Sequence, residues 1–250
     1  MLTAYKIGLA LALALTLVYA FQNYYSEYIS PLSSIASVFI AGAAAVFSGF
    51  ALRRYGRSTG KFSLIWVCFT AGMTLWFLGE LGYATYAIAL NVEIPYPSIA
   101  DAFWLAGYVP LSAALYLYVK MFTDALSKKT LVIVLSTVAV MSTLVSIGLV
   151  LPTIGAEGNM VTFAVNLAYP LLDLALFSTA LLGLAVFQRG ELGKSWLLMS
   201  AGILFNVSGD FLFSYTTARG VYYNGHPIDL PLLYGYILFL LAFCSHIKEL

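Results

Sequence analysis

Residues Trp76 to Tyr108 read WFLGELGYATYAIALNVEIPYPSIADAFWLAGY. The stretch places Glu80 inside an apolar run, continues through a Pro-rich turn, and enters a second apolar run at Asp101. Apolar runs of about 20 residues match the roughly 30 Å hydrocarbon core of a lipid bilayer. The stretch therefore predicts a pair of membrane-spanning helices that carries acidic side chains.

The composition of the whole chain agrees with this interpretation. Of 250 residues, 62% are hydrophobic and 9% are charged, against about 45–50% and about 25% in soluble domains. Such a chain cannot cover a globule with polar surface, so a soluble protein is excluded. We expect an all-α polytopic membrane protein that lies in the lipid bilayer and has no nucleic-acid partner.

Hydropathy and turn residues divide the chain into eight expected transmembrane helices, without a linker or a soluble domain. Their ranges are 3–21, 32–52, 63–88, 99–121, 130–151, 161–187, 195–217 and 230–247. Residues 1–250 are therefore interpreted as one transmembrane domain. The first helix has an alternative interpretation, because Lys6, the apolar residues 7–18 and the small Ala20 also fit a cleaved secretory signal.

The distribution of positive charge predicts the orientation. With eight spans, every lysine and arginine except Arg219 falls on the side that holds both termini. Basic loops favour the cytoplasmic side, so both termini are predicted to be cytoplasmic.

Residues 60–120 and 193–248 share an ordered series of motifs. The matches are Gly60-Lys61 with Gly193-Lys194, Trp66 with Trp196, Ala71-Gly72 with Ala201-Gly202, Gly79-Glu80 with Gly209-Asp210, Asp101 with Asp229, and Gly107-Tyr108 with Gly235-Tyr236. The offset stays between 128 and 133 residues. It spans four helices, an even number, which predicts a parallel 4+4 repeat with halves of about 1–122 and 130–250. The first two helices of the halves match poorly, and sites in such proteins tend to lie between the halves.

Five acidic residues are candidates for a site in the outer half of the bundle. Glu80, Asp173 and Asp210 fall well inside predicted spans, where an ionisable group costs at least about 2.5–3.5 kcal/mol and needs a buried partner. Asp101 follows Ser98 in a capping-box pattern, and Asp229 precedes a helix, so helix capping explains these two.

Basic residues are essentially absent from the outer half, so the partner must be of another kind. The alternatives are protonation, hydrogen bonds from tyrosine or asparagine, a metal, or a cationic ligand. The polar neighbours available are Tyr83, Tyr86, Tyr108, Asn166, Tyr169, Asn206, Tyr215 and Tyr236. Trp76 and Trp104 flank the acids and offer ring faces to a cation. A structural network of protonated carboxyls and tyrosines stays open as an alternative to a binding site.

Several motifs resemble the multi-helix N-terminal membrane sensor module found ahead of bacterial diguanylate cyclases and some sensor kinases. They are Trp76-Phe77-Leu78-Gly79-Glu80, Pro97-Ser98-Ile99-Ala100-Asp101-Ala102-Phe103-Trp104, Tyr169-Pro170-Leu171-Leu172-Asp173-Leu174, the segment 210–215, Asp229 and Gly235-Tyr236. The resemblance implies a sensory membrane module with an unidentified ligand. The chain ends at Leu250 without an output domain, so signalling through a separate cytoplasmic protein is expected.

A second resemblance covers one motif. Residues 204–210, LFNVSGD, are similar to a motif of the lysoplasmalogenase family of eight-helix membrane hydrolases with paired aspartates. It implies an intramembrane enzyme in which two carboxyls act as general acid and base.

The sequence favours a ligand-binding or sensor-type module with an acidic, tyrosine-rich pocket in the outer half. The expected ligand-binding residues are Glu80, Asp173, Asp210, Asp101, Asp229, Tyr108, Tyr236, Trp76 and Trp104. The expected ligand is a small cation or a lipid-like molecule, and the chain is expected to act through a separate output protein or as a homodimer. A lipid hydrolase using Glu80, Asp173 and Asp210 and a cation- or proton-coupled transporter remain alternatives. No cofactor is identified, and two cysteines with two histidines at opposite faces give no metal site of the usual zinc type.

Overall fold

A computed structural model describes residues 2–55, 61–90, 92, 94–121, 126–154, 159–187 and 193–248. Within this part of the chain every regular element is helical. The elements are α1 (Leu2–Ala20), η1 (Gln22–Tyr24), α2 (Ser26–Tyr55), α3 (Lys61–Ala84), η2 (Thr85–Leu90), α4 (Ile99–Lys120), α5 (Lys128–Val145), η4 (Ser146–Val150), α6 (Leu151–Ile154), α7 (Met160–Phe187), α8 (Gly193–Ala218), η5 (Pro227–Asp229) and α9 (Leu230–Lys248). The segments η2 and η4 are π-helical and extend α3 and α5, so these elements form eight helices long and apolar enough to cross a membrane. The prediction of eight such helices is confirmed.

The second helix begins earlier than the sequence predicts. A loop was expected as far as Pro31, but α2 already starts at Ser26 and contains Pro31. Proline inside a helix removes one backbone hydrogen bond and crowds the carbonyl group four residues earlier; for Pro31 that carbonyl belongs to Glu27 in the first turn of α2, where the acidic side chain interacts favourably with the helix dipole. Asn224 donates hydrogen bonds to Ser30 and Ser34 from the α8–α9 loop and ties this first part of α2 to the rest of the molecule.

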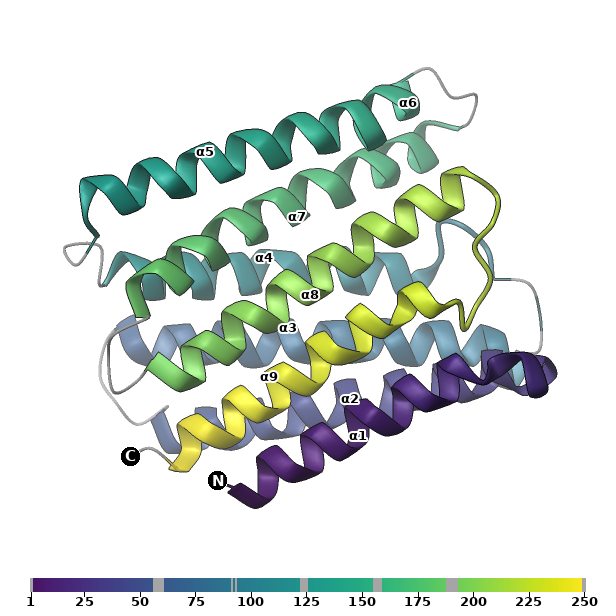
Figure 1. The fold of residues 1–250 in the computed structure, drawn as a ribbon, viewed down its shortest axis with the longest axis horizontal. Coiled ribbons are helices and arrows are strands. Elements are labelled where there is room, and N and C mark those ends of the chain that lie inside the picture. The colour runs from purple at the N-terminus through teal and green to yellow at the C-terminus, as the bar shows by residue number, and fades with distance from the viewer. Residues whose placement is uncertain are drawn as a thin grey trace.

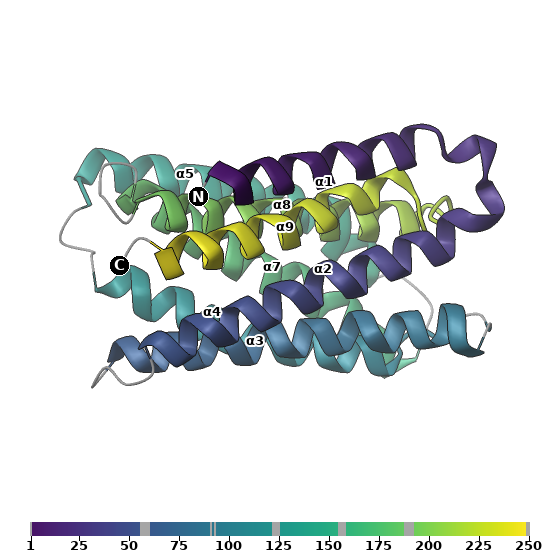
Figure 2. The same ribbon diagram turned by 90° about the horizontal axis from the view of Figure 1, so that it is seen from below.

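The helices run up and down as one bundle, with both termini at the same end (Figure 1). The helix α3 packs between α2 and α4, and in the same way α8 packs between α7 and α9. These two groups of three helices meet where α2 packs on α9 and where α4 packs on α7. The helix α1 packs mainly on α9, and α5 packs mainly on α7. Figures 1 and 2 show α1 and α5 at the margins of the bundle, where their exposed apolar side chains suit contact with lipid.

Two glycine pairs let neighbouring helices approach closely. A Cβ on Gly72 of α3 would lie 3.2 Å from the carbonyl oxygen of Gly107 in α4, and one on Gly107 would lie 3.3 Å from that of Gly72. The helices α8 and α9 cross in the same manner, with 3.1 Å from a Cβ on Gly202 to the oxygen of Gly235 and 3.0 Å in the reverse direction. Small residues at helix crossings favour close packing in membranes.

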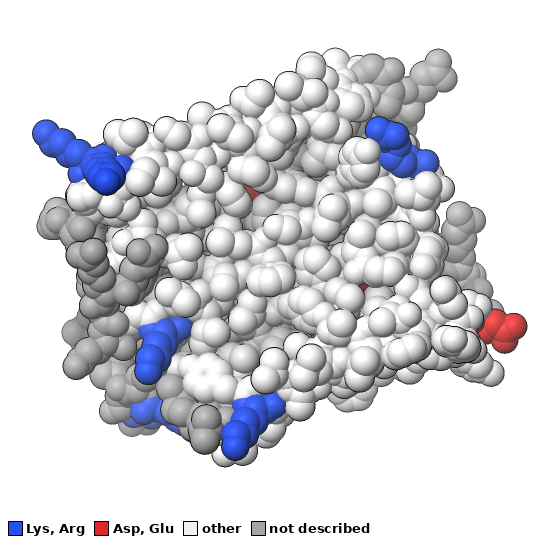
Figure 3. All heavy atoms as spheres, viewed as in Figure 1, with Lys and Arg blue, Asp and Glu red and all other residues white. Residues whose placement is uncertain are grey.

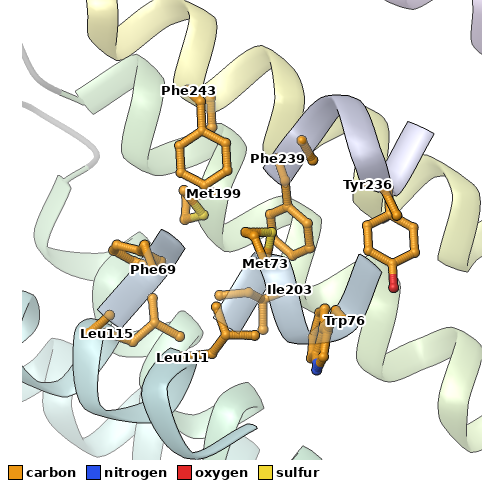
Figure 4. Close-up of a cluster of buried hydrophobic side chains, with 14 of the residues drawn as sticks. Phe69, Met73, Trp76, Leu111, Leu115, Met199, Ile203, Tyr236, Phe239 and Phe243 are labelled. Atoms are coloured by element: carbon orange, nitrogen blue, oxygen red, sulfur yellow. The ribbon is translucent and has the colours of Figure 1, made fainter. Parts of the chain in front are cut away.

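The core lies between these two helix pairs. Figure 4 shows Phe69, Met73 and Trp76 of α3 and Leu111 and Leu115 of α4 facing residues of the other pair. Those residues are Met199 and Ile203 of α8 with Tyr236, Phe239 and Phe243 of α9. The core therefore fixes the α3–α4 pair against the α8–α9 pair.

Charged side chains leave a broad apolar band around the molecule. The described lysines and arginines lie in the first or last two turns of helices, or at Arg219 directly after α8. In Figure 3 most of the blue side chains lie toward the end that holds the termini, and a white surface covers the middle. This surface is suited to the interior of a bilayer.

Candidate functional site

Tyr108 joins two acidic residues that belong to different helices. Its hydroxyl oxygen lies 2.6 Å from Asp173 Oδ1 of α7 and 3.1 Å from Asp210 Oδ2 of α8. A phenol has one proton to donate. Both contacts are full hydrogen bonds when one of the two carboxyls is itself protonated and donates to the phenol oxygen. The geometry thus suits a pair of carboxyls that holds one proton.

Glu80 of α3 is held by partners on two other helices. The hydroxyl of Tyr236 in α9 donates to Glu80 Oε1 at 2.9 Å, and the indole of Trp104 in α4 also hydrogen-bonds this carboxyl. The expectation that Glu80 has a buried partner is met by a tyrosine and a tryptophan. Glu80 and Asp210 also interact electrostatically, so the two acidic positions belong to one cluster.

The tyrosine–acid pairs cross between the two helix pairs. Tyr236 of the α8–α9 pair binds Glu80 of the α3–α4 pair, and Tyr108 of the α3–α4 pair binds Asp210 of the α8–α9 pair. Each hydrogen bond therefore ties one pair to the other. A change in either carboxyl acts directly on the packing between the pairs.

Trp76 lies at the centre of the aromatic part of the cluster. Its indole N–H donates to the carbonyl oxygen of Trp104 at 3.1 Å. Its ring contacts those of Tyr108 and Tyr236 edge-on, with centroids 5.4 and 6.2 Å apart. Trp76 thus contacts both acid-binding tyrosines, and Figure 4 shows it beside Tyr236 and Phe239.

Asp101 has two roles in the structure. It closes a capping box with Ser98 at the start of α4, as the sequence predicts. Its second carboxylate oxygen accepts a hydrogen bond of 2.9 Å from the hydroxyl of Tyr169, whose ring contacts that of Tyr108. The cap residue is therefore also connected to the acidic cluster.

Asp229 differs from its predicted role as a cap of the last helix. It ends the short helix η5, and its carboxylate accepts the backbone N–H of Gly225 at 3.0 Å. It also hydrogen-bonds the hydroxyl of Tyr222 and interacts electrostatically with Glu80. The hydrogen bonds of Asp229 reach back into the α8–α9 loop because η5 turns the chain before α9 begins.

The acidic side chains differ in exposure. Asp173 is 1% exposed, and Asp101 and Asp229 are also buried, whereas Glu80 and Asp210 are only half-buried. Specks of red within the white face of Figure 3 show acidic atoms reached from outside the bundle. Among the described residues no group of three or more Cys, His, Asp or Glu side chains is placed to hold a metal ion.

Two cavities lie apart from the acidic cluster. One, of about 360 Å³, is lined by Gln22, Asn23, Ser26, Ile29, Ser30, Tyr223 and Asn224 at the end opposite the termini. The other, of about 240 Å³, is an apolar groove between α2 and the α3–η2 helix. Neither lining includes any of the nine residues expected at the site. The acidic residues form a packed cluster, and these cavities are separate from it.

One member of the cluster was not anticipated from the sequence. Tyr222 hydrogen-bonds both Asp229 and Tyr83. Its position in a tyrosine pair, seven residues before Asp229, is the signal that could have indicated it. All nine expected residues are otherwise found in one connected set of hydrogen bonds, ring contacts and electrostatic interactions.

Comparisons with protein-family models, curated proteins and solved structures yield no match to this chain. The resemblances to a sensor module and to lysoplasmalogenases stay predictions, and the geometry of the acidic cluster is the basis for a function.

Proposed function

We propose that the chain is a multi-pass binding module of the sensor type in the cell membrane. Its ligand is a small cation, which binds at the acidic, tyrosine-rich cluster in the outer half of the bundle. The observation that carries this proposal is the crossed pair of hydrogen bonds, Tyr236 to Glu80 and Tyr108 to Asp210. Carboxyls inside a membrane bundle are by default functional, and these have tyrosine and tryptophan partners but no described basic partner.

The proposal includes a parallel repeat with both termini in the cytoplasm. It is supported by the glycine crossings, in which Gly72 and Gly107 correspond to Gly202 and Gly235 at the offsets found in the sequence. The packing of α2 on α9 and of α4 on α7 also agrees with two equivalent halves. Asp173 breaks the symmetry, because α2 carries no acidic residue beyond its first turn.

The cluster links ligand binding to helix packing. A cation or a proton neutralises carboxyls that otherwise repel one another at close range in a medium of low dielectric. The tyrosines that bind these carboxyls belong to the opposite helix pair, so occupancy shifts the balance between two arrangements of the pairs. The core shown in Figure 4 carries this shift to the cytoplasmic end, where a separate output protein or a second copy of the chain responds.

Native mass spectrometry after gentle extraction tests the binding proposal. We expect the wild-type protein to carry a small cationic species that Glu80→Gln and Asp210→Asn lose, with Glu27→Gln as the control. Glu27 lies in the first turn of α2, on the exposed surface. If the bound cation is a proton, its mass is too small to identify. The readout is then the infrared band of a protonated carboxyl. The absence of both signals from the wild type would refute the proposal.

A lipid hydrolase is the second candidate, because two carboxyls share one phenol. Asp173 and Asp210 on Tyr108 have the arrangement in which one carboxyl donates a proton and the other accepts one. Lipid turnover that Asp210→Asn abolishes would support the enzyme, whereas turnover unaffected by this change would exclude it. Uptake driven by a proton or cation gradient in proteoliposomes would instead indicate a transporter.

A further inference from the structure

A polar cavity lies at the end of the bundle opposite the termini, apart from the acidic cluster. It has a volume of about 360 Å³ and lies between η1, the start of α2 and the α8–α9 loop. This volume falls at the lower end of the roughly 300–1,000 Å³ that small-molecule sites occupy. Its described lining consists of amide and hydroxyl side chains, one tyrosine and one isoleucine, and none of these residues is charged. The cavity therefore suits a small, uncharged, polar molecule.

Gln22 is the strongest sign of a ligand in this cavity. The residue is only 7% exposed, and its side-chain oxygen accepts a hydrogen bond of 3.1 Å from the hydroxyl of Tyr223. The NH₂ group at the other end of the same amide has no hydrogen-bond partner among the described residues. Buried polar groups in proteins are nearly always paired. A molecule that fills the cavity is placed to accept a hydrogen bond from this NH₂ group.

The α8–α9 loop and α2 supply the complementary groups. The NH₂ group of Asn224 donates to the hydroxyls of Ser30 and Ser34 at 2.9 and 3.1 Å. These bonds use both protons of the amide. Within the described part of the chain, they leave the carbonyl oxygen of Asn224 as an acceptor and the hydroxyl proton of Ser30 as a donor. Donors and acceptors together suit the hydroxyl groups of a sugar, because each of these both donates and accepts hydrogen bonds.

The walls of the cavity are held in place by the protein itself. Gly225 follows Asn224 with a φ of 88°, which favours glycine, and its N–H donates to Asp229 at 3.0 Å. A Cβ at Gly225 would meet the backbone of Ile29 at 3.1 Å, so the loop lies directly on α2. The exposed ring of Tyr223 contacts that of His226, with centroids 4.9 Å apart. This ring offers an apolar surface to the C–H groups of a sugar.

We propose that this cavity is a second binding site, which takes one uncharged sugar ring. A charged sugar would bring an ionised group to a lining that has no described charge to pair with it, which is unfavourable. The cavity lies at an end of the bundle, where water and lipid headgroups meet, so the sugar comes from solution or from the headgroup of a glycolipid. Both sources present the same hydroxyl groups. The site is independent of the cation proposed for the acidic cluster.

Saturation-transfer NMR on the protein in phosphatidylcholine nanodiscs, assembled without sugar-based detergents, tests the site. The neutral probes are D-glucose, D-galactose and N-acetyl-D-glucosamine, and their charged counterparts are D-glucuronate, D-galacturonate and D-glucosamine. We expect at least one neutral sugar to bind, and its charged counterpart to bind more weakly by about tenfold or more. Gln22→Leu and Asn224→Ala should each raise the Kd by about tenfold, the effect of losing one hydrogen bond to the ligand.

Nanodiscs that also contain monoglucosyl diacylglycerol distinguish the two sources. If the ligand is a headgroup, native mass spectrometry should find this glycolipid retained by the wild type and lost from Gln22→Leu, with no binding of free sugars. If the ligand is a free sugar, the glycolipid should be retained equally by both proteins, as a lipid of the surrounding bilayer.

Tyr24→Phe is the matched control, because Tyr24 lies in η1 with Gln22, is 85% exposed and does not line the cavity. It should bind the sugar as the wild type does. The site is refuted if the wild type binds neither free sugar nor glycolipid, if charged sugars bind as tightly as neutral ones, or if neither Gln22→Leu nor Asn224→Ala weakens binding. The two substitutions lie in different elements, so one remains if the other prevents folding. Gln22→Leu should keep the cation signal of the acidic cluster, so the two sites stand or fail separately.

Discussion

The pairing of tyrosines with acids explains how this bundle tolerates carboxyls at depth. Isolated charged carboxylates in a bilayer cost at least about 2.5–3.5 kcal/mol each, and each hydroxyl that donates to one offsets part of this cost. Among these tyrosines Tyr108 offsets the largest part of the cost, since its hydroxyl contacts both Asp173 and Asp210.

We predict that Tyr108→Phe destabilises the protein more than Tyr236→Phe does. Glu80 keeps Trp104 as a partner when Tyr236 is changed, whereas Asp173 and Asp210 both lose their hydrogen bond when Tyr108 is changed. The expected loss for Tyr108→Phe is about 3 kcal/mol, the cost of leaving a buried polar group unpaired. Denaturant unfolding in detergent, followed by circular dichroism, measures it. Tyr24→Phe is the control, at a side chain that is 85% exposed, and equal stabilities of all three variants would contradict the prediction.

The pH dependence of one tyrosine gives a second prediction. Because burial and Asp229 raise the pKa of Tyr222 in the folded protein, folding favours the neutral phenol. Its contribution to the free energy of unfolding is therefore complete below the usual phenol pKa of about 10, and is lost as the pH rises above it. The destabilisation caused by Tyr222→Phe should be constant at neutral pH and shrink in strongly alkaline buffer. A destabilisation that grows as the pH rises would have the wrong sign.

At the scale of elements, close glycine crossings fix how each helix pair is arranged. The crossing of α8 and α9 is the tighter of the two. Its Gly202 lies about two helical turns before Asp210, and its Gly235 is next to Tyr236. The positions of the acids and tyrosines thus depend on backbone contacts between neighbouring helices.

We predict that Gly235→Ala destabilises the bundle by about 1–3 kcal/mol, the cost of overpacking. A Cβ there would lie 3.0 Å from the carbonyl oxygen of Gly202 and 3.3 Å from the backbone nitrogen of Asn206, so backbone must move on α8. Gly49→Ala on α2 is the matched control, with open space around its Cβ, and should be neutral or stabilising because alanine favours helix. Thermal unfolding of both variants measures the difference, and equal melting temperatures would show that the crossing tolerates a methyl group.

The sequence predicts the helices and the types of residue at the site, but it does not predict which of these residues contact one another. Runs of apolar residues define the eight helices, and an acid inside such a run stands out because it is costly, as with Glu80 and Asp173. The partner of each acid depends on how helices far apart in the chain pack. Tyr108, for example, meets Asp173 and Asp210 from two other helices. The periodicity of apolar residues within one helix does not predict which side chain of another helix becomes the partner of an acid. It also does not predict the turn at η5 that directs Asp229 toward Gly225.

The whole molecule has two different ends and an apolar middle. Both termini and most described basic residues lie at one end, while Arg219 and Asp229 lie at the other. The proposed signal to a separate output protein requires that the terminal end faces the cytoplasm.

Cysteine labelling of intact cells tests that orientation. With Cys68 and Cys244 replaced by alanine, Val221→Cys should react with a membrane-impermeant maleimide, because Val221 is 57% exposed beside Arg219. Met121→Cys, at the opposite end of the bundle and 46% exposed, should react only after permeabilisation. The reverse pattern would place the termini outside.

The most direct test is the distance between the two helix pairs at the end of the bundle that holds the termini, measured by pulsed electron paramagnetic resonance. Spin labels at Met121 of the α4 end and Leu197 of α8, both exposed positions, report on the two pairs in the cysteine-free background. We predict that the distance distribution shifts between alkaline and acidic buffer in the otherwise wild-type protein. Glu80→Gln and Asp210→Asn should each hold one distribution at every pH. A wild-type distribution that is the same at every pH and with every cation added would contradict a sensor that works through the crossed tyrosine–acid pairs.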